Sequence, residues 1–118
     1  MVRFTVITVT YNAGDKLKET VADVLRQTYD NYEILIKDGL STDGSLEVLP
    51  ASEKIRVESC KDQGIYDAMN MAVKLAQGDW CVFMNAGDFF QKKDTDKGAF
   101  EVLEGYGKYG PGVKIFPS

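Results

Sequence analysis

The fold is best read from Gly78-Asp79-Trp80-Cys81-Val82-Phe83-Met84-Asn85-Ala86-Gly87-Asp88, in which an unbroken apolar run meets a polar turn. The apolar residues, Trp80 to Met84, include β-branched and aromatic side chains, a pattern typical of a strand buried on both faces. The turn ends at the carboxylate of Asp88. Because open α/β sheets bind ligands beyond the carboxyl ends of their strands, Asp88 is either a ligand-binding residue or an acidic residue of a solvated turn.

The composition is that of one soluble globular domain with a real core, since 44% of the 118 residues are hydrophobic. The net charge of −4 and the scattered basic residues argue against a nucleic-acid surface. The chain has no histidine, which excludes histidine-based acid–base catalysis and most zinc sites. Cys60 and Cys81 are too few for a disulfide framework and are expected to be buried free thiols, as in a reducing compartment. With no signal peptide and no apolar run of membrane length, we expect a cytoplasmic protein.

Apolar runs predict four strands, over residues 4–10, 33–37, 56–59 and 80–85. Between them, apolar side chains at spacings of three and four predict helices that begin at Asp15 and near Ile65, with a short helix over 45–49. This alternation with short connections predicts a Rossmann-like, three-layer α/β/α fold with a mostly parallel sheet. The expected spatial order of the strands is 3-2-1-4.

A polar loop follows each predicted strand. The first loop holds Tyr11-Asn12, the second Asp38, the third Asp62, and the fourth Asn85 and Asp88. The carboxyl ends of parallel strands lie at the same edge of a sheet, so these side chains are expected to converge. Convergence of several carboxylates favours a ligand site over a set of solvated turns.

Two acidic residues have a simpler interpretation as helix caps. Asp15 is expected to cap the first turn of the helix that it begins, and Asp43 to cap the next helix along the chain.

Four motifs, in this order and spacing, resemble the family 2 glycosyltransferases over about residues 3 to 90. They are Ile7–Asn12, Ile36–Ser45, Asp62–Asn70, and Gly78-Asp79 together with Asn85–Asp88. The resemblance implies a GT-A fold, with a nucleotide-sugar-binding domain over residues 1–90. Residues 91–118 would be a carboxyl-terminal extension, with one helix over 94–103 and then a glycine-rich tail.

The resemblance also implies an activity, namely inverting transfer of a sugar from a nucleotide-diphosphate sugar to a glycan or lipid-linked acceptor in polysaccharide biosynthesis. A UDP-sugar is the expected donor, and Mg²⁺ or Mn²⁺ the expected cofactor, since a divalent cation offsets the negative charge of the departing diphosphate. Peripheral membrane association of the parent enzyme and a homodimer are further expectations.

Residue roles follow from the resemblance, motif by motif. Asp38 would accept a hydrogen bond from the base, Asp62 and Gly64 would lie beside the nucleotide, and Asp88 would bind the metal. Asn85, which stands where many relatives have a first acidic residue, would also be a nucleotide-sugar-binding residue. The base and ribose pocket would be lined by Thr10, Tyr11 and Asn12.

The family's general base is not found in this chain. Glu101 and Glu104 are the only acidic residues after Asp96, and neither stands in a recognisable motif. The catalytic residue is therefore unknown, and the chain is expected to stop before the acceptor-binding half. A non-catalytic nucleotide-binding module is the alternative. A flavodoxin-like signalling domain fits less well, because it needs an acidic pair after the first strand, where Thr10-Tyr11-Asn12 supplies none.

Overall fold

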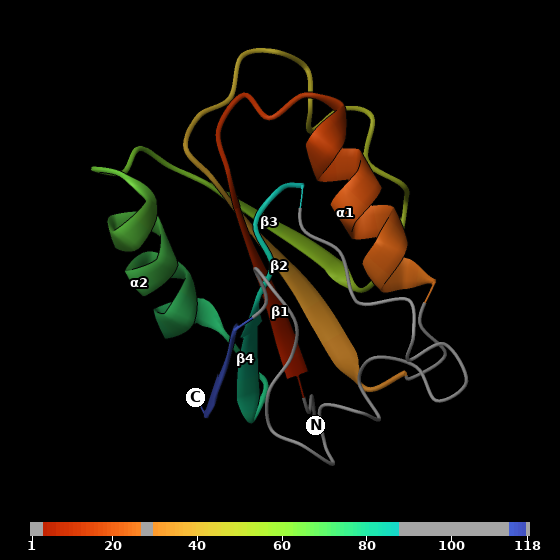
Figure 1. Ribbon diagram of the computed structural model, residues 1–118, viewed down its shortest axis with the longest axis vertical. Coiled ribbons are helices and arrows are strands. Elements are labelled where there is room, and N and C mark those ends of the chain that lie inside the picture. Colours follow the sequence, from red (N-terminus) through yellow and green to blue (C-terminus); the bar gives the residue numbers. More distant parts are fainter. Residues whose placement is uncertain (1–3, 27–29, 88–113, 118) are drawn as a thin grey trace.

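The computed structural model describes residues 4–26, 30–87 and 114–117 (Figure 1). The elements alternate along the chain for most of its length. In chain order they are β1 (Phe4–Thr10), α1 (Asp15–Leu25), β2 (Tyr32–Asp38), β3 (Ile55–Ser59), α2 (Ile65–Leu75), β4 (Trp80–Phe83) and β5 (Lys114–Pro117).

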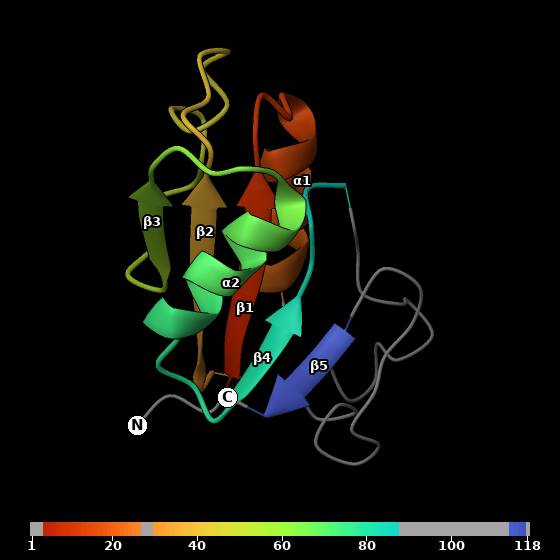
Figure 2. The same ribbon diagram turned by 90° about the vertical axis from the view of Figure 1, so that its left-hand side faces the viewer.

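The strands form one sheet in the order β3-β2-β1-β4-β5. The pairs among β1 to β4 are all parallel, which confirms the predicted order 3-2-1-4. β5 pairs antiparallel with β4, and its arrow runs opposite to the others in Figure 2. This strand was not predicted, because the residues before it are rich in glycine and proline. The predicted helix over 94–103 lies outside the described residues.

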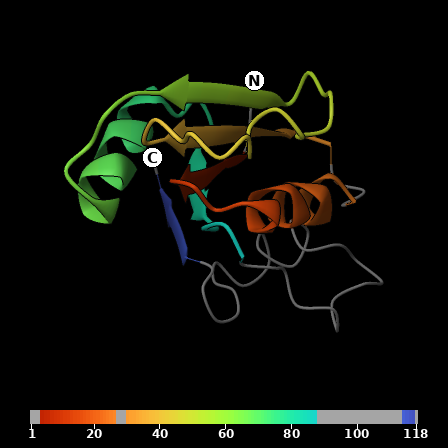
Figure 3. The ribbon, with the colours of Figure 1, turned by 90° about the horizontal axis from the view of Figure 1, so that it is seen from above.

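The two helices lie on opposite faces of the sheet, as Figures 1 and 3 show. Successive residues of a strand point to opposite faces, so each face takes alternate positions. One face is packed against Leu17, Val21 and Val24 of α1. The other face, which includes Ile7 and Leu35, is packed against Ala72 of α2. The predicted three-layer α/β/α fold is therefore confirmed.

Three local predictions need correction. Residues 45–49 form turns rather than a helix, with hydrogen bonds from Glu47 N to Gly44 O and from Leu49 N to Leu46 O. Asp15 begins α1 but does not cap it, because the N-cap residue is Gly14 and no side chain of the helix start caps it. Asp43 accepts a hydrogen bond from Gly14 N at 2.9 Å, so it serves the preceding helix rather than the next one.

A buried hydrogen-bond network lies at the amino edge of the sheet. Glu33, which is 8% exposed, accepts hydrogen bonds from Thr5 Oγ1 at 2.7 Å, from Gln77 N at 2.9 Å and from Arg56 at 3.1 Å. Burial raises the pKa of Glu33, but the hydrogen bonds from Thr5, Gln77 and Arg56 outweigh it and hold the pKa below its ordinary value. Gly78 N donates to Thr5 Oγ1 at 2.9 Å, which ties the start of β4 to β1.

Both cysteines are free thiols, as predicted, although only Cys81 is fully buried. Neither described helix is long and apolar enough to cross a bilayer.

Candidate functional site

A cleft of about 380 Å³ opens at the carboxyl edge of the sheet. It lies between the loop after β1, the start of α2 and the segment after β4. Most residues of the predicted nucleotide pocket line it, although they come from distant parts of the chain. The lining residues are Val9, Thr10, Tyr11, Ala13, Asp62, Gly64, Ile65, Ala68, Asn85 and Ala86.

The β1 side of the cleft combines an exposed ring with a buried hydroxyl. Tyr11 is 65% exposed, so most of its side chain is accessible to a ligand. Thr10 is buried, and its Oγ1 has no hydrogen-bond partner within the described part of the chain. Since an unpaired buried hydroxyl is costly, a ligand that hydrogen-bonds to Thr10 would recover that cost.

Asn12 is not among the residues that line the cleft. Its hydrogen bonds join the loop after β1 to the loop after β2. Its backbone N–H donates to Ser41 Oγ at 2.8 Å, and its side-chain Oδ1 accepts from Thr42 N at 2.7 Å. Asn12 has a φ of 49°, a left-handed conformation that asparagine tolerates better than most residues. Its contact with the base or ribose stays a prediction.

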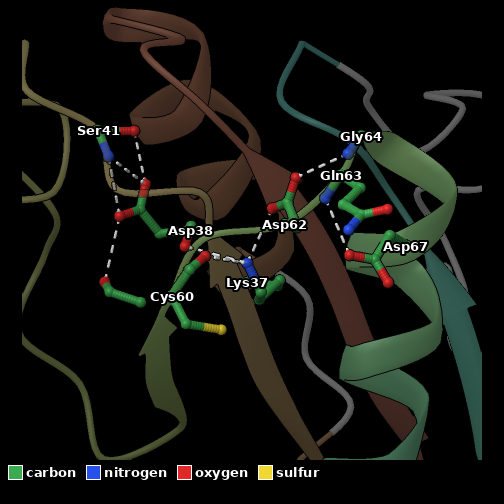
Figure 4. Close-up of polar contacts among 9 residues, drawn as sticks. Lys37, Asp38, Ser41, Cys60, Asp62, Gln63, Gly64 and Asp67 are labelled. Carbon is green, nitrogen blue, oxygen red and sulfur yellow. Dashed lines mark hydrogen bonds and ion pairs between the residues drawn. The ribbon is translucent and has the colours of Figure 1, made fainter.

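Asp38 is also outside the cleft lining and is only 1% exposed. Its carboxylate accepts hydrogen bonds from Ser41 N at 3.1 Å, Ser41 Oγ at 2.5 Å and Ser59 Oγ at 3.1 Å. Figure 4 shows this carboxylate turned toward Ser41. The described partners of Asp38 therefore lie in the loop after β2 and at the end of β3, and its hydrogen bond to a base stays a prediction.

Asp62 is the carboxylate that the described residues place in the cleft. Its Oδ1 accepts a hydrogen bond from Gly64 N at 3.0 Å, and its Oδ2 accepts one from Lys37 Nζ at 2.9 Å (Figure 4). The hydrogen bond from Lys37, then the one from Gly64 and the positive charge of Lys37, hold the pKa of Asp62 below its ordinary value. Gly64 has a φ of 123°, a conformation that favours glycine.

Lys37 is the functional candidate that the sequence analysis missed. It is 1% exposed although it carries a charge, and it also donates to Cys60 O at 2.7 Å and Asp38 O at 3.2 Å. Its position in the sequence could have indicated a role. A lysine at the end of a strand buried on both faces needs a partner, because lysine is almost never fully buried unless paired.

The metal prediction lies outside the described residues, because Asp88 does. Within the described part of the chain, no group of three or more acidic, histidine or cysteine side chains is placed to hold a metal ion. Asp62 already has its charge compensated by Lys37, so it does not by itself make a metal site. The segment before Asp88 is anchored, since Gly87 N donates to Thr20 Oγ1 of α1 at 2.8 Å. Glu101 and Glu104 also lie outside the described residues.

Among solved structures, the chain is similar to the crystal structure of S. aureus TarS 1-349 in complex with UDP-GlcNAc. The TM-score is 0.72 at 24% identity, over 90% of this chain and 32% of TarS 1-349. It is also similar to the mannosyltransferase PcManGT from Pyrobaculum calidifontis in complex with GDP-Man and Mn²⁺, with a TM-score of 0.69 at 24% identity, over 86% of this chain and 32% of PcManGT. At this identity the likeness shows the fold, which is of the GT-A type.

Curated relatives are similar at higher identity. The PGL/p-HBAD biosynthesis glycosyltransferase of Mycobacterium tuberculosis is 35% identical over 97 residues, which is 78% of this chain and 38% of that protein. The UDP-Glc:alpha-D-GlcNAc-diphosphoundecaprenol beta-1,3-glucosyltransferase WfaP of Escherichia coli is 33% identical over 88 residues, which is 72% of this chain and 35% of WfaP. The chain thus spans little more than a third of these relatives. The family model for glycosyl transferase family 2 matches residues 5–116, and this chain belongs to that family.

Proposed function

We propose that this chain forms the donor-binding part of an enzyme that transfers a sugar from a nucleoside-diphosphate sugar. One observation carries the proposal. Residues predicted from separate motifs, Thr10, Tyr11, Asp62, Gly64 and Asn85, line one cleft at the carboxyl edge of the sheet. That edge is where α/β sheets of this type bind nucleotides.

The chemistry of the cleft suits the nucleoside half of such a donor. The exposed ring of Tyr11 offers a flat apolar face on which a base can stack. The Asp62 carboxylate, an acceptor without a proton of its own, suits hydroxyl or N–H donors of the ribose or base. The Thr10 hydroxyl provides a further partner at the same wall of the cleft.

The finer parts of the proposal are a UDP-sugar donor, transfer with inversion, and a glycan or lipid-linked acceptor in polysaccharide biosynthesis. WfaP supports a UDP-sugar and a lipid-linked acceptor, because its name describes glucosyl transfer from UDP-Glc to a diphosphoundecaprenol-linked sugar. Mg²⁺ or Mn²⁺ is the proposed metal, with Asp88 as its ligand, since PcManGT has been solved with both GDP-Man and Mn²⁺. When bound, the metal would offset charge on the diphosphate.

The strand order separates this proposal from the flavodoxin-like alternative. In a flavodoxin-like sheet the third strand follows β1 on the side away from β2. Here β3 pairs with β2, and β1 lies between β2 and β4. A non-catalytic nucleotide-binding module has the same sheet and differs only in the absence of transfer.

Thermal unfolding with UDP, GDP, CMP and dTDP, each with and without Mn²⁺, tests the proposal. A ligand that binds only the folded state stabilises it by about 2.7 kcal/mol at a hundredfold excess over Kd. We expect UDP with Mn²⁺ to raise Tm most. No shift with any of these nucleotides would contradict the proposal, and binding without sugar transfer to added glycan or lipid-linked acceptors would favour the non-catalytic alternative.

A further inference from the structure

Lys37 joins the end of β2 to the loop between β3 and α2 through a buried ammonium group. Its three N–H groups have three acceptors, namely Cys60 O at 2.7 Å, Asp62 Oδ2 at 2.9 Å and Asp38 O at 3.2 Å. An ammonium group donates three hydrogen bonds and accepts none, so this set satisfies it completely. Burying a charge is tolerated only with such pairing, which makes the arrangement a specific feature of this site.

Asp62 is held on more than one side. Lys37 and the backbone N–H of Gly64 each occupy one carboxylate oxygen, which leaves each oxygen with a second lone pair for a ligand. A Cβ atom at Gly39 would lie 3.0 Å from Asp62 Oδ2 and 3.5 Å from Tyr11 Cδ1. The absence of a side chain at position 39 therefore gives the carboxylate and the Tyr11 ring room to lie together at the cleft.

We propose that Lys37 is a positioning residue of this cleft, which holds the Asp62 carboxylate where it accepts hydrogen bonds from a nucleoside and compensates its charge. This inference rests on the proposed function. A nucleoside diphosphate is an anion, and an uncompensated carboxylate in the cleft would repel it. With Lys37 behind it, Asp62 keeps its acceptor oxygens while the pair carries no net charge.

The pH dependence of binding distinguishes this role from a merely structural one. The charged and titratable groups around Asp62 are Lys37 of β2, Asp67 in the first turn of α2 and Tyr11, whose side chain lies beside Gly39 with the Asp62 carboxylate. Lys37 is the cation among them, and it lowers the pKa of Asp62. Its removal should raise that pKa, so the UDP affinity of the variant should depend on pH as Asp62 takes up a proton, because protonation removes both an acceptor oxygen and an uncompensated negative charge. The terminal phosphate of UDP also takes up a proton in this range, so the variant is compared with the native chain at each pH.

The test compares Lys37→Met, Asp62→Asn and the double variant with the native chain, using calorimetric titration of UDP from neutral to acidic pH. Lys54→Met is the matched control, because it removes a lysine that pairs with the exposed Asp30 instead. We expect Lys37→Met to weaken UDP binding about tenfold at neutral pH, the effect of losing a charge-assisted hydrogen bond, and to give binding a pH profile that differs from the native one. Lys54→Met should bind as the native chain does.

The double variant shows whether Lys37 acts through Asp62. If it does, adding Lys37→Met to Asp62→Asn should cost little further affinity, and this comparison holds even where Lys37→Met alone does not fold. An equal loss in both backgrounds, or a folded Lys37→Met with native affinity and pH profile, would overturn the role of Lys37 and leave the proposed function standing. Failure of the native chain to bind UDP or GDP would overturn both.

Discussion

Asp38 belongs to a predicted binding motif, but its described hydrogen bonds stabilise the loop after β2. The sequence analysis placed it at the end of β2 facing a base. The structure buries its carboxylate among Ser41 and Ser59, so removal of the carboxylate leaves their donors unpaired.

We therefore expect Asp38→Ala to lower the free energy of unfolding by about 1.5–3 kcal/mol, the range for hydrogen bonds to a charged group. Urea unfolding measures this. Ser59→Ala is the control, since it removes one of the donors rather than their common acceptor, and it should cost less. An unchanged urea midpoint for Asp38→Ala would show that the loop does not depend on this carboxylate.

Tyr11 should matter for binding rather than for folding, because its ring is 65% exposed. Tyr11→Ala is expected to weaken UDP binding by about 1–3 kcal/mol, the range for base–aromatic stacking, and Tyr11→Phe should retain most of it. Tm should change little in either variant. Tyr66→Ala is the control, since Tyr66 is 80% exposed and does not line the cleft. Equal UDP affinity of Tyr11→Ala and the native chain would exclude stacking on this ring.

Glu33 makes the stability of the chain depend on pH. Its pKa in the folded state is lower than the ordinary value of 4.5. A lowered carboxyl pKa stabilises the fold above the unfolded-state value, and that contribution is lost as pH falls through the folded-state value. The difference in unfolding free energy between the native chain and Glu33→Gln should therefore be largest near neutral pH and should shrink below about pH 4.5. A difference that stays constant down to acidic pH would contradict this assignment.

At the scale of the elements, the four parallel strands were predictable from their apolar runs, whereas β5 and the turns over residues 45–49 were not. β1 and β2 are buried along their whole length, so nearly every residue of each contributed to the pattern. β5 ends in Pro117, a residue disfavoured in central strands, and follows a glycine-rich segment. Residues 45–49 begin after Gly44 and end before Pro50, which leaves room for turns but not for a helix.

The loops after β1 and β2 are joined by contacts that no local sequence pattern predicts. Asp43 Oδ2 accepts from Gly14 N at the start of α1, while Asp43 Oδ1 accepts from Ser45 N at 3.0 Å in its own loop. Asp43→Ala is thus expected to lower Tm, because both N–H groups lose their acceptor. Asp15→Ala is the matched control and should lower Tm less, since Asp15 does not cap the helix. Equal Tm values for the two variants would mean that the loops are held by other contacts.

At the scale of the whole molecule, the topology followed from the alternation of strands and helices, because short connections between parallel strands allow few arrangements. The same reasoning brought Tyr11, Asp62 and Asn85 to one edge. It did not show which way each side chain turns once it is there. Asn12 and Asp38 turn into the loops, and Lys37 supplies the counter-charge to Asp62, because those contacts depend on how two loops pack.

The metal prediction also belongs to this scale. It proposes that Asp88 binds a metal ion beside a nucleotide that several loops of the carboxyl edge bind together. UDP is expected to bind more tightly with Mn²⁺, and Asp88→Asn should remove most of that gain, because hard oxygen ligands hold such ions. Calorimetric titration with and without Mn²⁺ measures it. Asp79→Asn, before the amino end of β4, is the control. UDP binding that is indifferent to Mn²⁺ would defeat the proposed role of Asp88.

Gly78 has a consequence for mutational screens of this chain. A Cβ atom there would lie 2.7 Å from both the carbonyl carbon of Phe4 and the backbone nitrogen of Thr5, and neither backbone atom can move aside as a flexible side chain would. A library selected for donor binding would therefore reject nearly every substitution at Gly78, although this position lies at the opposite edge of the sheet from the cleft. A screen scored by activity alone would mistake Gly78 for a binding residue. The yield of folded protein would instead identify Gly78 as a position where the backbones of β1 and the start of β4 are in contact.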